Sequence, residues 1–161
     1  MVIGDPYTFS VFAQVIDSWN QDDTFRNGIL LICIDGILYP QEVFTATLKY
    51  DAWYLQNNLK NIPVTTNLFE QPKNQLFIEL YNQDYCGKND YRFGIAPPVL
   101  TDHNCYIFAV SDGKNIRILA SKLKYIKETG MHDLKNIQIH EAYVTSENIN
   151  EIVTKLNLVI E

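Results

Sequence analysis

The segment that decides the fold is GILLICIDGILYP, residues 28–40. Asp35-Gly36 lies between two apolar runs, and this dipeptide favours a two-residue type I′ turn, which needs positive φ at both positions. The turn predicts an antiparallel pair between residues 29–34 and 37–39. Pro40 then ends the pairing, because proline cannot donate to a strand ladder.

A further strand is predicted upstream of this hairpin. Residues 8–16, TFSVFAQVI, alternate with a period of two, which is typical of a strand with one buried face. Trp19 follows, and the polar stretch 20–28 ends in Asn27-Gly28, which indicates a hairpin loop. Three antiparallel strands are therefore predicted within the first 40 residues.

The rest of the chain is predicted to form more strands and two helices. Asp51 is placed to cap the first helix, and Thr145 or Ser146 can cap the second. A glycine-containing turn at 111–115 separates two apolar runs and predicts a hairpin. In chain order the predicted elements are a strand at 43–48, a helix at 52–61, a strand at 76–81, a polar loop at 82–91, a hairpin of 105–110 with 116–120, a strand at 137–144 and a helix at 147–158.

This order predicts an α+β fold in a single domain over residues 1–161. Strands joined by hairpins imply one antiparallel β-sheet of about six to eight strands, with two main helices packed on one face. The length suits one ordinary domain. A doubly wound nucleotide-binding fold is not implied.

The charge of the chain is acidic and uneven. The net charge is −6, from 13 Lys and Arg against 19 Asp and Glu. Nonspecific nucleic-acid binding needs cationic side chains against phosphates, so the sequence predicts no nucleic-acid partner and favours a basic one. Residues 1–60 hold seven acidic and three basic residues, which is −4 of the total. The plainer interpretation is that these acids occupy turns and helix caps.

No membrane partner is predicted, and the expected compartment is the cytoplasm. The apolar runs are shorter than the roughly 18–20 residues that span a bilayer. The start, MVIGDPY, lacks the basic and apolar regions of a secretory signal. Three cysteines, Cys33, Cys86 and Cys105, form no CxxC pair, and an odd number argues against a disulfide framework.

No motif for catalysis, cofactor binding or metal binding is present. GxSxG, GxGxxG and GxxxxGK[ST] are absent, so we expect no enzyme, no cofactor and no metal site. The alternative is a small hydrolase or transferase site assembled from His103, Cys105 and a remote acid. Against it, Cys105 lies in an apolar strand, where a thiol usually packs as a small hydrophobe.

Two segments combine acidic side chains with aromatic ones, as protein-binding surfaces do. In one, three aspartates surround a tryptophan. In the other, residues 79–90, an aspartate lies between Tyr81 and Tyr85. The alternative for each aromatic residue is packing in the core. The candidate contact residues are Asp17, Trp19, Asp22, Asp23 and Asp84.

The N-terminal part of the chain resembles the immunity protein 42 family. The resemblance lies in the Ile3-Gly4-Asp5-Pro6 start and in the Gly-x-x-Tyr-Pro element at 36–40. The later strands and the C-terminal helix are compatible with it.

The resemblance implies a bacterial cytoplasmic antitoxin of a polymorphic toxin or contact-dependent growth inhibition system. Such a protein binds the C-terminal toxin domain of a delivered effector and blocks its active site or a partner surface, and it needs no catalytic residue. The motif carries over no contact residues. The acidity suits a nuclease toxin with a basic cleft, while a pore-forming or other toxin and a regulatory protein-interaction domain remain alternatives.

Overall fold

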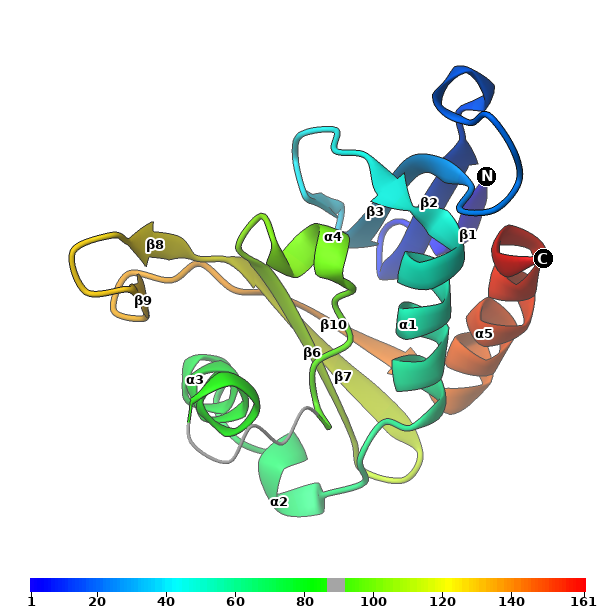
Figure 1. Cartoon of the computed structure of the whole chain (residues 1–161). Coiled ribbons are helices and arrows are strands. Elements are labelled where there is room, and N and C mark those ends of the chain that lie inside the picture. Colours follow the sequence, from blue (N-terminus) through cyan, green and yellow to red (C-terminus); the bar gives the residue numbers. More distant parts are fainter. Residues whose placement is uncertain (87–91) are drawn as a thin grey trace.

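Two main antiparallel sheets organise the chain, and helices cover them (Figure 1). The computed structural model describes residues 1–86 and 92–161. The first sheet has the order β1-β2-β3-β4, and β5 also pairs with β3. Its strands are β1 Val2–Asp5, β2 Phe9–Val15, β3 Asn27–Ile34, β4 Ile37–Tyr39 and β5 Ala46–Thr47.

The predicted turn at Asp35-Gly36 is confirmed. The two residues have φ angles of 50° and 78°, and Ile34 pairs with Ile37 across the turn. Positive φ at both central positions is the signature of a type I′ turn. The alternation in residues 8–16 is also confirmed, since β2 buries Phe9, Val11 and Ala13. The sequence pattern does not indicate β1, because only Ile3 of its four residues is buried.

A second sheet lies in the middle of the molecule. It has the order β10-β7-β6, from β6 Cys105–Ser111, β7 Asn115–Lys122 and β10 His140–Thr145. Two of its strands, β6 and β7, are buried on both faces. In β6, Ile107 and Ala109 belong to the larger core, which the first sheet shares, whereas Phe108 and Val110 belong to a second core. A strand covered on both faces has no polar side, which explains the continuous apolar run that predicted this hairpin.

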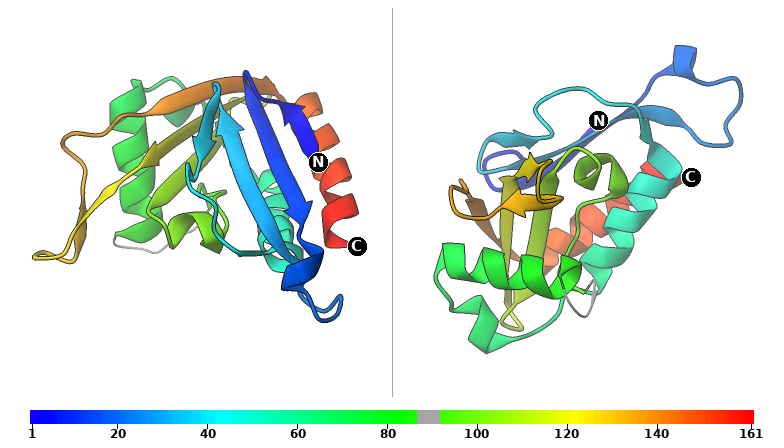
Figure 2. Two further views of the ribbon diagram at one scale, coloured as in Figure 1. Left: turned by 90° about the horizontal axis from the view of Figure 1, so that it is seen from above. Right: turned by 60° about the vertical axis from the view of Figure 1, so that its left-hand side comes forward.

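Two long helices, α1 Leu48–Lys60 and α5 Ser146–Ile160, pack beside each other and close the larger core (Figures 1 and 2). Both predicted helices are therefore confirmed, and Thr145 caps α5 by accepting a hydrogen bond from the Asn148 N–H at 3.1 Å. Between the helices, the buried Gln56 donates to the carbonyl of Val153 at 2.8 Å and to Asn157 Oδ1 at 2.7 Å.

The prediction that Asp51 caps α1 is wrong, because Asp51 lies inside the helix. The helix begins at Leu48, so Asp51 lies in its first turn and is 4% exposed. Its carboxylate accepts hydrogen bonds from the Thr47 N–H at 2.9 Å and the Val99 N–H at 3.2 Å. Burial raises the pKa of Asp51, and these two bonds oppose the rise. The carboxylate thus joins α1 to the short helix α4 Pro98–Thr101.

The predicted strand at 76–81 is wrong, because these residues lie within the helix α3 Lys73–Tyr85. Aromatic and apolar residues favour strands in isolation, but tertiary packing selects the helical period here. The buried positions recur at helical spacing and are Leu76, Phe77, Leu80 and Tyr81. The predicted loop at 82–91 is helical up to Tyr85, and its residues 87–91 lie outside the described part of the chain.

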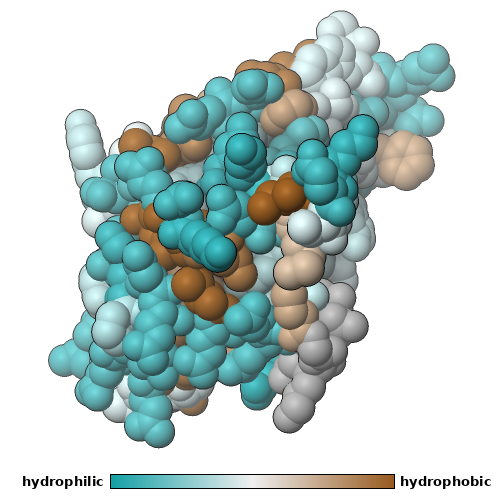
Figure 3. Space-filling view, turned by 90° about the vertical axis from the view of Figure 1, so that its left-hand side faces the viewer, coloured by the Kyte–Doolittle hydropathy of each residue, from teal (hydrophilic) through white to brown (hydrophobic). Residues whose placement is uncertain are grey.

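The α3 side of the molecule carries the second core. A hairpin of β8 Lys124–Ile126 and β9 Met131–Asp133 stands beside α3 (Figures 1 and 2). From this side, a group of apolar side chains lies among polar ones (Figure 3). Leu134 and Ile137 pack against the second core and are only partly buried.

One charged side chain, Arg117 of β7, is buried in the central sheet. Its Nε donates to Glu141 Oε2 at 3.0 Å, and its Nη2 lies 3.0 Å from the same oxygen. Its Nη1 donates to the carbonyls of Phe69 at 2.9 Å and Gln71 at 2.5 Å. The guanidinium therefore pairs β7 with Glu141 of its neighbour β10, and it binds the end of α2 Thr66–Phe69 and the segment before α3 to the sheet.

The predicted α+β class with antiparallel strands is confirmed, but the single sheet is not. The strands divide between two main sheets and one separate hairpin. Helices lie on both sides of the central sheet, with α1 and α5 at the larger core and α3 at the second one. Among the described residues, no helix combines the length and apolar character needed to cross a bilayer.

Candidate functional site

A projecting loop, residues 17–26, connects β2 to β3 (Figure 1). It begins with the 3-10 turn η1 Asp17–Trp19. The side chain of Asn20 closes its base: Nδ2 donates to the carbonyls of Ile16 at 2.8 Å and Asn27 at 2.9 Å, and Oδ1 accepts from the Asn27 N–H at 2.6 Å. Asn27 Nδ2 also donates to the carbonyl of Trp19 at 3.2 Å. These bonds fix the two ends of the loop to each other.

The loop brings four of the five predicted contact residues together at the surface. Asp17, Asp22 and Asp23 are exposed, and Trp19 is 42% exposed. Asp22 Oδ1 accepts from the Thr24 N–H at 2.8 Å, and hydrogen bonding to Thr24 holds the pKa of Asp22 below its usual value. All three carboxylates therefore face open solvent.

The tryptophan side of the loop is hollowed. A surface hollow of about 290 Å³ lies between the loop and the start of β3. Its lining residues are Trp19, Asn20, Gln21, Asp22, Phe25 and Asn27. A hollow with aromatic and amide walls can receive a side chain of a partner protein.

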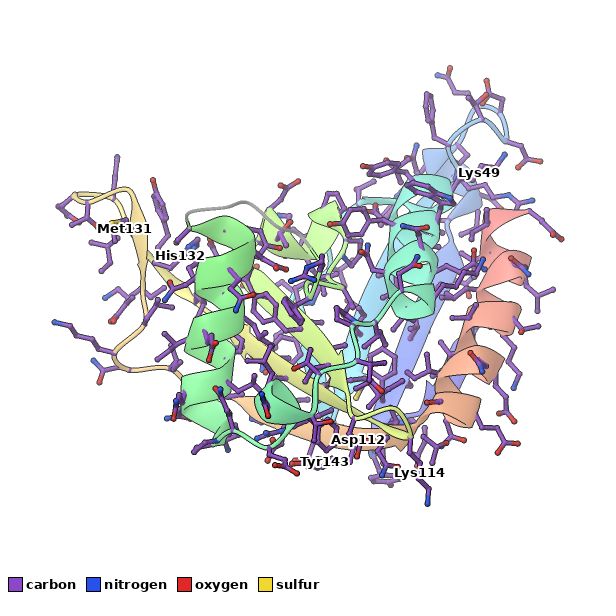
Figure 4. The ribbon with its side chains drawn as sticks, turned by 90° about the horizontal axis from the view of Figure 1, so that it is seen from below. Lys49, Asp112, Lys114, Met131, His132 and Tyr143 are labelled. Atoms are coloured by element: carbon purple, nitrogen blue, oxygen red, sulfur yellow. The ribbon has the colours of Figure 1, made fainter. Side chains whose placement is uncertain are left out.

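The far end of the loop is bonded to both long helices. The carbonyls of Phe25 and Arg26 accept from the N–H groups of Lys49 at 3.4 Å and Leu48 at 3.0 Å, at the start of α1. Arg26 Nη1 donates to the carbonyl of Val159 in α5 at 3.3 Å. In Figure 4, Lys49 lies where α1 meets the loop. Hydrogen bonds thus join the loop to α1 and α5 as well as to the two strands that it connects.

Asp84 does not belong to this surface. It lies in α3, is 0% exposed, and its Oδ2 accepts from the Gly94 N–H at 2.6 Å. Tyr81 and Tyr85 of the same segment pack against the second core. A buried carboxylate cannot contact a partner protein, so Asp84 has a structural position instead.

Sequence reasoning missed three exposed aromatic side chains near the loop. Phe25 is 60% exposed, Tyr50 is 50% exposed and Trp53 is 49% exposed. The available signal was helical spacing: Tyr50 and Trp53 lie three residues apart, whereas the buried residues Ala52, Leu55 and Leu59 lie on the other side of α1.

The structure does not bring His103 and Cys105 together as a reactive pair. His103 Nδ1 donates to the carbonyl of Val99 at 2.8 Å, and its ring stacks on Phe44. The Cys105 thiol is 0% exposed and donates to the His103 carbonyl at 3.7 Å, not to its ring. Burial raises the pKa of Cys105 to about 11, which keeps it a thiol at neutral pH. This alternative is therefore not favoured.

Another histidine, His132, belongs to an aromatic cluster beside α3 (Figure 4). His132 Nδ1 is 2.7 Å from the Tyr81 hydroxyl, and Nε2 is 2.8 Å from Asn104 Oδ1. Burial lowers the pKa of His132. Within residues 1–86 and 92–161, no three His, Cys, Asp or Glu side chains gather as metal ligands do.

The same arrangement of sheets and helices is present in a solved structure. The fold is similar to that of CdiI from Burkholderia dolosa AUO158, with a TM-score of 0.75 and 20% sequence identity over 98% of this chain and 99% of that one. A comparison with curated proteins found no match. The profile of the family described as immunity protein 42 matches residues 1–158, and the chain belongs to that family. It is an immunity protein, which confirms the resemblance in its N-terminal motifs.

Proposed function

We propose that this immunity protein neutralises its cognate toxin domain through the loop 17–26, by binding and without catalysing a reaction. The observation that carries the proposal is an acidic loop whose ends are joined by hydrogen bonds and whose first turn carries a half-exposed tryptophan. A preorganised loop loses little conformational entropy on binding, and a buried tryptophan is a frequent source of binding energy at interfaces.

The charge of the loop defines the surface that it suits. Asp17, Asp22 and Asp23 give it a negative potential, which accelerates association with a basic surface. A nuclease toxin has such a surface, because its cleft must hold phosphates. We propose that the loop covers a basic cleft of this kind and excludes the substrate.

The setting of this encounter is also a proposal. Similarity to CdiI of Burkholderia dolosa supports delivery of the toxin by a contact-dependent inhibition system. We place the encounter in the bacterial cytoplasm, where a reducing environment keeps cysteines unpaired. The free cysteines Cys33, Cys86 and Cys105 agree with that compartment.

The proposal is tested with the toxin domain encoded beside this chain. Pull-down should recover the complex, and co-expression should rescue growth from the toxin. If the pull-down recovers no complex and co-expression gives no rescue, this toxin is not the partner.

The role of the loop is tested by charge reversal. The variant Asp22→Lys/Asp23→Lys should associate at least about tenfold more slowly at low salt, and the difference should shrink as salt screens the charges. The control, Glu128→Lys/Glu151→Lys, makes the same charge change at exposed positions outside the loop. Equal association rates for the two variants would place the interface elsewhere.

A further inference from the structure

The exposed side of α1 carries a row of aromatic rings. Tyr50 and Trp53 are half-exposed, and their ring centroids are 6.1 Å apart. The ring of Tyr54 lies 6.4 Å from that of Tyr50. The opposite side of the helix supplies the core residues Ala52, Leu55 and Leu59. Tyr50 and Trp53 are therefore not needed to close the core, and about half of their surface meets solvent.

This row begins where α1 is bonded to the end of the loop 17–26. Lys49 binds the carbonyl of Phe25 through its backbone N–H, and Tyr50 is the next residue of the helix. Trp53 follows Lys49 by four residues, which is about 6 Å along a helix axis. We define the aromatic face as Trp19, Phe25, Tyr50 and Trp53.

The aromatic face is large enough to matter in an interface. Aromatic side chains of this size bury about 150–250 Å² each, so four that are about half exposed offer on the order of 400 Å². A standard interface buries about 800 Å² on each partner. Asp22 lines the same hollow as Trp19 and Phe25, as polar residues surround the anchors of a binding surface.

We propose that Tyr50 and Trp53 are anchor residues for a basic side chain, Arg or Lys, of the toxin domain. This inference rests on the proposed function and extends its surface from the loop onto α1. The faces of aromatic rings attract cations, and nearby carboxylates add to that attraction. An arginine can stack on Trp53 while its neighbours pair with the aspartates of the loop.

The test measures the dissociation constant for the toxin domain by calorimetry. Trp53→Ala should weaken binding by about 30-fold or more, and Tyr50→Ala should weaken it less. The matched control is Tyr7→Ala, because Tyr7 is 84% exposed and lies at the other end of β2 from the loop. Its affinity should stay within about twofold of the wild-type value.

Two conservative variants separate cation binding from simple apolar contact. Trp53→Phe keeps an aromatic face and should retain most of the affinity, whereas Trp53→Leu should lose it. Equal affinity of these two variants would refute the proposal that a basic side chain binds on Trp53. A wild-type dimer that Trp53→Ala dissolves would show that a second copy covers the face, which would also overturn it.

Failure of this inference is distinguishable from failure of the proposed function. If wild-type protein binds the toxin and Trp53→Ala and Tyr50→Ala bind equally well, only the extension onto α1 is lost. If wild-type protein does not bind the toxin, the proposed function itself fails. Thermal unfolding of each variant checks that the fold is intact, and Tyr50→Ala gives a second reading where Trp53→Ala is unstable.

Discussion

Replacing Asn20 with alanine should loosen the loop 17–26 and weaken its function. The change removes three hydrogen bonds, to Ile16 and Asn27, at 2.6–2.9 Å. A neutral hydrogen bond contributes about 0.5–1.5 kcal/mol net, and water can reach this half-buried site, so we expect a loss of about 2 kcal/mol. For a domain of this size that loss lowers Tm by about 4–8 °C.

The binding of the toxin should fall as well, because the looser loop must be ordered when the complex forms. Immobilising side chains costs roughly 0.5–1.5 kcal/mol each, so we expect about tenfold weaker affinity. Calorimetry gives both quantities, and hydrogen exchange at the Asn27 amide reports the loop directly. The control is Asn61→Ala, which removes one exposed bond to the Asn57 carbonyl. An unchanged hydrogen-exchange rate at the Asn27 amide in Asn20→Ala would refute the claim that Asn20 holds the ends of the loop together.

Three further predictions concern the buried Arg117, His132 and the cysteines. Arg117→Met leaves the carboxylate and two carbonyls that Arg117 binds without their donor, so we expect a loss of about 3 kcal/mol and a Tm lower by roughly 6–12 °C in calorimetry; an unchanged Tm would contradict it. Burial lowers the pKa of His132 from 6.5, so the unfolded chain binds the proton more tightly and stability falls as pH drops below that value. His132→Gln should lose less free energy of unfolding than the wild-type protein between about pH 7 and 5, as measured by urea titration. An equal loss in the two proteins would show that His132 is not the source of the pH dependence. A thiol reagent should label the exposed Cys86 quickly and the buried Cys33 and Cys105 only after unfolding; fast labelling of all three would contradict their burial.

The sequence predicted correctly those parts of the fold that are determined by residues adjacent in the chain. Asp35-Gly36 carries its turn type in two residues, and Thr145 caps α5 from an adjacent position. The helix α3 was missed because its pattern of apolar residues also suits a buried strand, and only contact with the central sheet decides between them. The division into two sheets likewise depends on contacts between distant strands, which no short pattern encodes.

The candidate surface was predicted in part. Acidic residues around Trp19 lie close in sequence, so the loop could be found without the fold. Asp84 was misplaced because its charge suggested exposure, whereas the fold buries it against Gly94. Tyr50 and Trp53 join the surface only because backbone bonds bring the start of α1 to residues 25 and 26.

The bond from Arg26 to the carbonyl of Val159 has a consequence for how a cell makes this protein. A ribosome adds about 5–20 residues per second, and the loop leaves it well before α5 does. Until α5 is made, the loop lacks this support, and the larger core lacks the side that Ile149, Ile152, Val153, Leu156 and Val159 provide. If the loop binds the toxin as proposed, a nascent chain has no complete binding surface, and a cell that meets the toxin depends on molecules completed before the encounter.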